Sequence, residues 1–174
     1  MYTLRVAILI DAPVAVCFDL ARSVDAHVKS AAGTGERVVG GRRSGLLELG
    51  DEVTWEGRHF GFVQRLSSRI TEFRPFTFFQ DRMAKGAFRF LEHDHVFQSH
   101  GGGTLMTDVL RFEAPFGPLG WVAERVVLDP HLRRFLVARG RVLKAMAEDS
   151  RPSGTVTAGP VSPNAAGRPS RVGR

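Results

Sequence analysis

Residues 36–113 form a series of short runs rich in β-branched and aromatic residues, with Gly, Ser or Pro between the runs. Such runs place alternate side chains on opposite faces and are typical of strands in an antiparallel sheet. The triplet Gly101–Gly103 predicts the clearest hairpin, because glycine adopts positive φ without steric cost. The predicted strands are Glu36–Val39, Asp51–Arg58, Phe60–Phe73, Phe76–Met83, Phe88–Gln98 and Thr104–Glu113.

The residues before this region predict one further strand and two short helices. Large apolar residues occupy every second position from 4 to 10, which predicts a strand ending at Asp11. Asp11 is the expected N-cap of the first helix, with Pro13 tolerated in its first turn. Ser23 is the expected cap of a second short helix that includes His27 to Ala32, and Gly33 is expected to end it.

After Pro115 the spacing of the apolar residues becomes that of a helix, with an interruption expected near Asp129-Pro130. The large apolar residues of this helix share one face, the apolar stripe. One basic residue, Arg139, also lies on that face, because at 100° per residue it falls within about 20° of Leu132. The other basic residues occupy the opposite face, as solvated residues do. The apolar stripe consists of Leu132, Phe135, Leu136, Leu143 and Met146.

The excess positive charge is concentrated at the C-terminal end of the chain. The formal net charge is +6 and the isoelectric point about 10.6. Residues 151–174 hold four arginines and no acidic residue, which leaves +2 for residues 1–150. The same segment lacks Leu, Ile and aromatic residues, so it cannot bury enough surface to offset its chain entropy. The sequence predicts a folded domain over residues 1–148, a disordered tail over 149–174, and no specific nucleic-acid partner.

Cys17 is the only cysteine of the chain. It excludes an intramolecular disulfide and a zinc site built from several cysteines, and it fits a reducing compartment. No stretch approaches the roughly 20 apolar residues that cross a bilayer, and residues 1–11 do not read as a signal peptide. We therefore expect a cytoplasmic protein without a transmembrane segment.

The order of these predicted elements resembles the helix-grip fold of the START-like or SRPBCC superfamily over residues 1–148. Five segments are similar to the bacterial SRPBCC group described as cyclase/dehydrase or ligand-binding, namely Gly50–Trp55, Arg58–Gly61, Asp81–Phe88, His93–Phe97 and Gly102–Asp108. The resemblance implies an α+β fold, in which a seven-stranded curved antiparallel sheet wraps around the long C-terminal helix and two short helices follow the first strand. It also implies an internal cavity for a hydrophobic or amphipathic molecule such as a lipid, quinone, polyketide or aromatic compound.

Strand parity and helix phase select the side chains expected to face this cavity, because one face of a sheet packed on a helix turns inward. The even positions of the strand over 88–98, Glu92 and Asp94 among them, are expected to face water. The expected polar inward set is Trp55, His59, Asp81, His93, His95, Asp108 and Arg139. The expected apolar neighbours are Phe79, Met83, Leu91, Phe97, Met106 and Leu110.

Two roles remain open for the polar inward set. His93, His95 and Asp108 are the candidate catalytic residues, because a carboxylate beside an imidazole tunes it for acid–base work on a carbonyl. The alternative is a structural network that joins the sheet to the helix. Arg139 binds a ligand carboxylate or phenolate, pairs with Asp81 or Asp108, or extends its charged end to solvent.

The sequence favours a non-catalytic binding module, with a polyketide cyclase or dehydratase-like enzyme as the alternative. It predicts no cofactor. It also predicts no metal, because His93-x-His95 with Asp108 nearby lacks a further ligand fixed by spacing. A hydrophobic small molecule is the expected partner, and the pattern specifies no oligomeric state.

Overall fold

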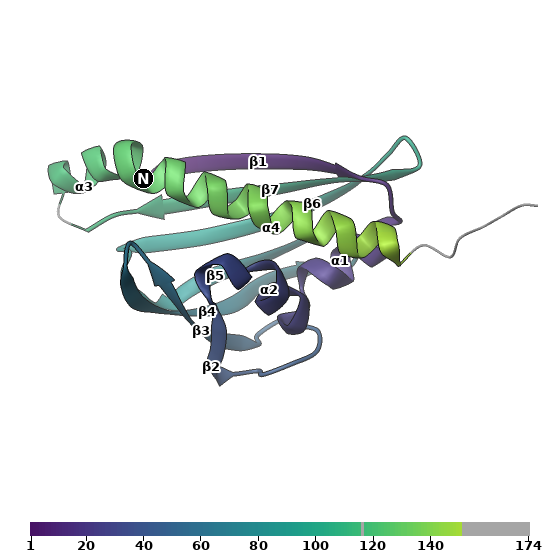
Figure 1. The fold of residues 1–174 in the computed structure, drawn as a ribbon, viewed down its shortest axis with the longest axis horizontal. Helices are drawn as coiled ribbons and strands as arrows, with labels where there is room; N and C mark the ends of the chain where they lie inside the picture. The colour runs from purple at the N-terminus through teal and green to yellow at the C-terminus, as the bar shows by residue number, and fades with distance from the viewer. Residues whose placement is uncertain (116, 151–174) are drawn as a thin grey trace, which may run out of the picture.

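A computed structural model describes residues 1–115 and 117–150. Seven strands form one antiparallel sheet in the order β1-β7-β6-β5-β4-β3-β2, and a long helix crosses one face of it (Figure 1). The strands are β1 (Tyr2–Ile10), β2 (Arg37–Gly41), β3 (Glu52–His59), β4 (Phe62–Arg74), β5 (Phe78–Lys85), β6 (Phe90–His100) and β7 (Gly103–Glu113).

Two short helices follow β1, and a continuous helical region closes the described chain. The two short helices are α1 (Val14–Ala21) and α2 (Val24–Ser30), and a 3₁₀ turn, η1 (Ala32–Thr34), follows them. The continuous helical region consists of α3 (Gly117–Ala123), a π-helical turn η2 (Glu124–Leu128) and α4 (Asp129–Asp149). The expected interruption near Asp129-Pro130 takes the form of this π-helical turn, which ends at Leu128. Pro130 lies in the first turn of α4, where its missing N–H is tolerated.

The helix caps confirm one expectation and correct two. The Ser23 side chain accepts a hydrogen bond from Ala26 N at 3.2 Å, as predicted for the cap of α2. Pro13 takes the N-cap position of α1 in place of Asp11, whose backbone N–H donates instead to Glu148 Oε1 on α4. The second helix ends at Ser30, before Gly33, and Gly35 with φ of 63° ends the 3₁₀ turn.

Turn residues with positive φ set the strand ends. Gly101 and Gly102, at 56° and 86°, form the predicted hairpin between β6 and β7. Phe60 and Phe76, at 53° and 60°, also have positive φ. The strands expected to begin at these two phenylalanines therefore begin two residues later, because the tertiary structure overrides their preference for extended backbone.

The sheet curves around α4, and the core divides along that helix. Register shifts in β4 near Ser68 and Ile70, and in β2 at Val38, bend the strands. Two of the three apolar clusters in the described part of the chain lie along that helix: one joins α1 and the C-terminal half of α4 to the sheet, and the other packs Leu136 against β1, β6 and β7. Arg139 lies on α4 between Leu136 and Leu143, so a polar centre separates the two clusters.

The outer face of the sheet differs from the expectation of strand parity. Glu92 and Asp94 on β6 are buried, although even positions were expected to face water. Arg111 lies over both, with Nη1 2.9 Å from Glu92 Oε1 and Nη2 2.8 Å from Asp94 Oδ2. Arg82 also pairs with Glu92. Guanidinium groups on neighbouring strands therefore cover these carboxylates, which alternation alone does not reveal.

The tail was predicted from residue 149, yet Asp149 is the last residue of α4. From residue 151 onward the predicted tail lies outside the described residues. None of the helices in the described part of the chain has both the length and the apolarity needed to cross a bilayer.

Candidate functional site

A cavity of about 170 Å³ lies between the sheet and α4. Its walls come from β3 to β7 and α4, with contributions from α1, α2 and the segment before β2. It reaches the surface near Phe60 and Arg65, which are both exposed. Five of the six histidines of the chain line it: His27, His59, His93, His95 and His131.

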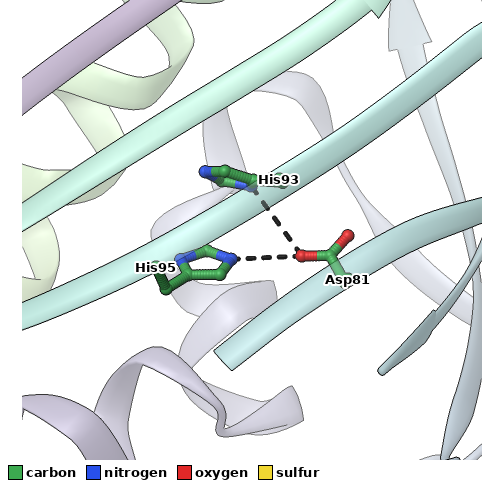
Figure 2. Close-up of side chains that lie close together, drawn as sticks. All are labelled: Asp81, His93 and His95. Atoms are coloured by element: carbon green, nitrogen blue, oxygen red, sulfur yellow. Dashed lines mark hydrogen bonds and ion pairs between the residues drawn. The ribbon is translucent and has the colours of Figure 1, made fainter. Parts of the chain in front are cut away.

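Polar residues from three neighbouring strands meet at one part of the cavity wall. In the sheet register, Asp81 on β5 lies opposite His93 on β6, and His95 on β6 lies opposite Asp108 on β7. Figure 2 shows the two imidazoles of β6 directed toward the carboxylate of Asp81. Arg139 approaches from α4, and together these five residues form the inner cluster.

The distances in the inner cluster are those of ion pairs. His95 Nε2 lies 3.1 Å from Asp81 Oδ2, and His93 Nδ1 lies 3.9 Å from the same oxygen (Figure 2). On their other sides, His93 Nε2 and His95 Nδ1 lie 3.0 Å and 2.9 Å from Asp108 Oδ1. The angles of these last two contacts fall outside hydrogen-bond geometry. The predicted pairing of Asp108 with a histidine therefore involves both imidazoles.

The two histidines of the inner cluster have opposite pKa shifts. Burial lowers the pKa of His95, but the carboxylates of Asp108 and Asp81 outweigh burial and the net pKa is raised. Burial and the neighbouring His95 lower the pKa of His93, and Asp108 offsets only part of this. Burial raises the pKa of Asp108, yet contacts with both imidazoles hold it well below its usual value.

Arg139 joins the inner cluster to the helices. It is 4% exposed, which confirms the inward position predicted from the helix phase. Its Nη2 donates to Ala21 O at 3.1 Å, and its Nη1 lies 3.9 Å from Asp108 Oδ1. The Arg139 side chain therefore does not extend to solvent, and it makes the predicted pairing with Asp108.

A second polar group, the outer cluster, consists of His27, Glu36, His59 and His131. Glu36 Oε2 lies 2.6 Å from His27 Nε2, and Glu36 Oε1 lies 3.4 Å from His59 Nε2. His59 Nδ1 is 3.1 Å from His131 Nε2. Burial raises the pKa of Glu36, but hydrogen bonds with His27 and His59 outweigh it and lower the pKa to about 2.

Sequence reasoning included only His59 of the outer cluster. Its members come from α2, the segment before β2, β3 and α4, so no single periodic pattern connects them. The ring of His27 stacks on Trp55, with centroids 4.0 Å apart, which links this cluster to a residue that was expected in the cavity. The available signal was composition, because the chain has only six histidines and three of them belong to the outer cluster.

The structure divides the residues expected around the cavity into two groups. Those that line it are Trp55, His59, Asp81, Leu91, His93, His95, Leu110 and Arg139. Those that do not are Phe79, Met83, Phe97, Met106 and Asp108. Phe79, Phe97 and Met106 fill the core beside α1. Met83 packs against the other core cluster, and Asp108 lies behind the two imidazoles.

Several wall residues were not among the site residues expected from the sequence, although Phe135 and Leu136 belong to the predicted apolar stripe of the long helix. Phe135 and Leu136 on α4 and Phe88 before β6 supply apolar surface, and Gln64 on β4 supplies a polar group. The cavity is therefore apolar for most of its wall, with the inner and outer clusters as its polar regions.

The inner cluster also brings together possible metal donors. Asp81, His93 and His95 each offer one donor atom, and these atoms lie within 4.8 Å of one another. The donor that the sequence pattern lacked is Asp81, which the neighbouring strand β5 supplies.

Solved structures share this fold at low sequence identity. A protein from Thermus thermophilus has a TM-score of 0.67 and 18% identity, with 84% of this chain and 99% of that chain covered. The Zhui aromatase/cyclase from Streptomyces sp. R1128 has a TM-score of 0.67 and 14% identity, covering 89% of this chain and 99% of its own. Major latex-like protein 151 from Panax ginseng has a TM-score of 0.60 and 14% identity, covering 84% and 97%.

No protein-family model and no curated protein matches the chain. The similarity of this chain to known proteins therefore rests on solved structures, which confirm the expected helix-grip fold.

Proposed function

We propose that this chain, which has the helix-grip fold of the START-like superfamily, binds a compact amphipathic molecule with at least one aromatic or polyketide-like ring. The observation that carries the proposal is the cavity itself. Its volume of about 170 Å³ is close to that of an engineered protein cavity, of about 150 Å³, that binds benzene. This size favours a ring over a long acyl chain.

The polar regions of the wall indicate the other end of the ligand. Leu91, Leu110 and Phe135 provide apolar contacts, while the inner cluster presents buried imidazoles and a guanidinium. Binding pockets of this composition use the apolar wall for affinity and a few polar groups for orientation. The ligand therefore carries a carbonyl, phenol or carboxylate that faces the inner cluster.

The solved structures that share the fold support this class of molecule by analogy, because a fold does not determine a function.

Cys17 is buried and free, which is compatible with a reducing compartment. The cytoplasmic location stays a prediction.

Binding of 1-naphthol, a small ring with one hydroxyl, tests the proposal by calorimetry. We expect saturable binding with one molecule per chain, and loss of binding in Leu110→Phe, which fills the cavity. Leu119→Phe is the matched control, because Leu119 is 71% exposed on α3 and lies outside the cavity. Absence of binding by the unchanged protein, together with no small molecule co-purifying from a cell extract by mass spectrometry, would contradict the proposal.

A cyclase or dehydratase-like enzyme is the second candidate, and the inner cluster is the observation that favours it. Two imidazoles and the Asp81 carboxylate face the cavity, within reach of a ligand carbonyl. Proton transfer to and from a carbonyl compound needs groups at this range. Turnover of poly-β-ketothioester mimics by the unchanged protein, lost when His93, His95 and Asp108 are all replaced by Ala, is the expected result. Turnover that survives the triple replacement excludes this mechanism.

A further inference from the structure

Three side chains of the inner cluster present donor atoms in a compact triangle on one side of the cavity (Figure 2). Asp81 Oδ2 lies 3.1 Å from His95 Nε2 and 3.9 Å from His93 Nδ1, and all three atoms lie within 4.8 Å of one another. In a tetrahedral zinc site with bonds of about 2.0–2.1 Å, neighbouring ligand atoms lie about 3.3 Å apart. The triangle therefore has nearly the size of one face of such a site.

The other nitrogen of each imidazole is directed to a second carboxylate. His93 Nε2 and His95 Nδ1 lie 3.0 Å and 2.9 Å from Asp108 Oδ1. Metal-binding histidines usually donate their remaining N–H to a carboxylate or carbonyl, which fixes the tautomer and the ring orientation. Asp108 is placed to do this for both rings at once, with the nitrogens nearer Asp81 left as donors to a cation.

The contacts of Asp108 are close but poorly aligned. Asp108 Oδ1, His93 Nε2 and His95 Nδ1 are fully buried, and none makes a hydrogen bond of good geometry. Buried polar atoms without an aligned hydrogen bond are rare in folded proteins, and a bound ion is one of the few arrangements that accounts for them. An ion between Asp81 and the two rings reorients the imidazoles, and it can thereby align both contacts.

The formal charges of the inner cluster also fit a divalent cation. With both imidazoles neutral, the two carboxylates and Arg139 sum to −1. A divalent ion changes this sum to +1, which one anionic oxygen from a ligand neutralises. A buried site favours neutrality because isolated charges are costly to desolvate.

We propose that Asp81, His93 and His95 bind a divalent transition-metal ion, with Asp108 as the carboxylate that orients both histidines and a fourth coordination position that opens into the cavity. Two imidazoles and one carboxylate select zinc and related first-row ions over calcium or magnesium, which prefer oxygen ligands. The fourth position takes water or an anionic oxygen of a ligand, such as a phenolate, enolate or carboxylate.

This proposal departs from the sequence-based expectation of no metal. That expectation followed from the spacing of His93 and His95 alone, whereas the further donor comes from the neighbouring strand. The proposal does not depend on the organic ligand, because metal binding is measured with the ion alone.

Titration of the full-length, tag-free and chelator-treated protein with Zn²⁺ and Co²⁺ tests the site. We expect one ion per chain by calorimetry, and visible absorption of four-coordinate cobalt. Asp81→Asn and His93→Ala should each weaken binding by at least about 100-fold, and Asp108→Asn by about 10–100-fold. His100→Ala is the control, since His100 is exposed at the end of β6 and should leave the affinity unchanged.

A readout on the unchanged protein covers the case in which a variant does not fold. In histidine-labelled protein, Co²⁺ should shift the ring NMR signals of His93 and His95 and leave that of His100 in place. The proposal is overturned if the unchanged protein binds no ion in the micromolar range, if Asp81→Asn binds as tightly as the unchanged protein, or if cobalt shifts the His100 signal alone.

Discussion

Arg139 Nη1 on α4 lies 3.9 Å from Asp108 Oδ1 on β7, and both side chains are almost fully buried. The guanidinium also donates to Ala21 O, so one side chain connects α4, the sheet and the end of α1. This arrangement places a positive charge within the inner cluster, where it partly compensates the charges of Asp81 and Asp108.

Replacing Arg139 by Met should destabilise the protein by about 3 kcal/mol, because it leaves a buried carboxylate with less compensation and a carbonyl without its donor. Arg134→Met is the matched control, since Arg134 is exposed on the same helix and should change the free energy of unfolding by less than about 0.5 kcal/mol. Urea denaturation of both variants measures the difference. Equal effects would contradict a structural role for Arg139.

Glu36 should make stability depend on acid pH. Its pKa is about 2 in the folded protein, against an ordinary value of 4.5. A carboxyl group with a lower pKa in the folded state stabilises the fold above its unfolded pKa, and this contribution is lost as the pH falls toward 2. Glu36→Gln should therefore cost about 1–3 kcal/mol at neutral pH, and the cost should shrink between about pH 5 and pH 2.

Unfolding of the unchanged protein and Glu36→Gln at a series of pH values measures this effect. Glu72→Gln serves as the control, because Glu72 is exposed on β4 and pairs with the exposed Arg74, and such pairs contribute little. A cost of Glu36→Gln that stays constant across the pH range would show that its hydrogen bonds with His27 and His59 do not stabilise the carboxylate.

Local periodicity predicted the inner cluster well, because its members repeat at fixed intervals within single elements. His93 and His95 share a face since side chains alternate along a strand, and Arg139 falls in the apolar stripe of its helix. The outer cluster has no such period. Glu36 meets His27 and His59 only after α2 and β3 fold against one another, and His131 contacts His59 across 72 positions of sequence.

Periodicity also could not place residues along the sheet. Phe79 and Phe97 lie on the predicted inner face, yet α1 covers their end of the sheet and they become core instead of cavity wall. Phe60 and Phe76 favour strands by residue type, whereas the turns around them require positive φ. Both outcomes depend on packing between distant elements, which the sequence pattern does not describe.

Phe18 on α1 should be the most costly single aromatic residue to remove. It is 1% exposed and contacts Phe73, Phe76, Phe79 and Phe97, with ring centroids 5.3–5.7 Å away in edge-to-face geometry. Phe18→Ala leaves a cavity at the centre of this group and should cost about 3–5 kcal/mol. Urea denaturation measures the cost.

The control for Phe18→Ala is Phe62→Ala, because Phe62 is 73% exposed at the start of β4. It should change the free energy of unfolding by less than about 0.5 kcal/mol. A cost for Phe18→Ala no greater than that of the control would mean that the aromatic group does not stabilise the attachment of α1 to the sheet.

Phe60 should contribute to ligand binding more than to stability. Its ring lies at the surface end of the cavity, 4.2 Å from the His131 ring between centroids, and its φ of 53° is unfavourable for a residue other than glycine. Phe60→Gly relieves about 1 kcal/mol of backbone strain, which offsets much of the lost ring contact. We expect little change in the free energy of unfolding, but an affinity for 1-naphthol about 5–10-fold lower, since one aromatic wall is gone.

The control is Phe76→Gly, which relieves similar strain at φ of 60° away from the cavity. This variant should bind 1-naphthol with the affinity of the unchanged protein. Calorimetry on the two variants decides the matter, because equal affinities would show that Phe60 is a turn residue with no part in binding.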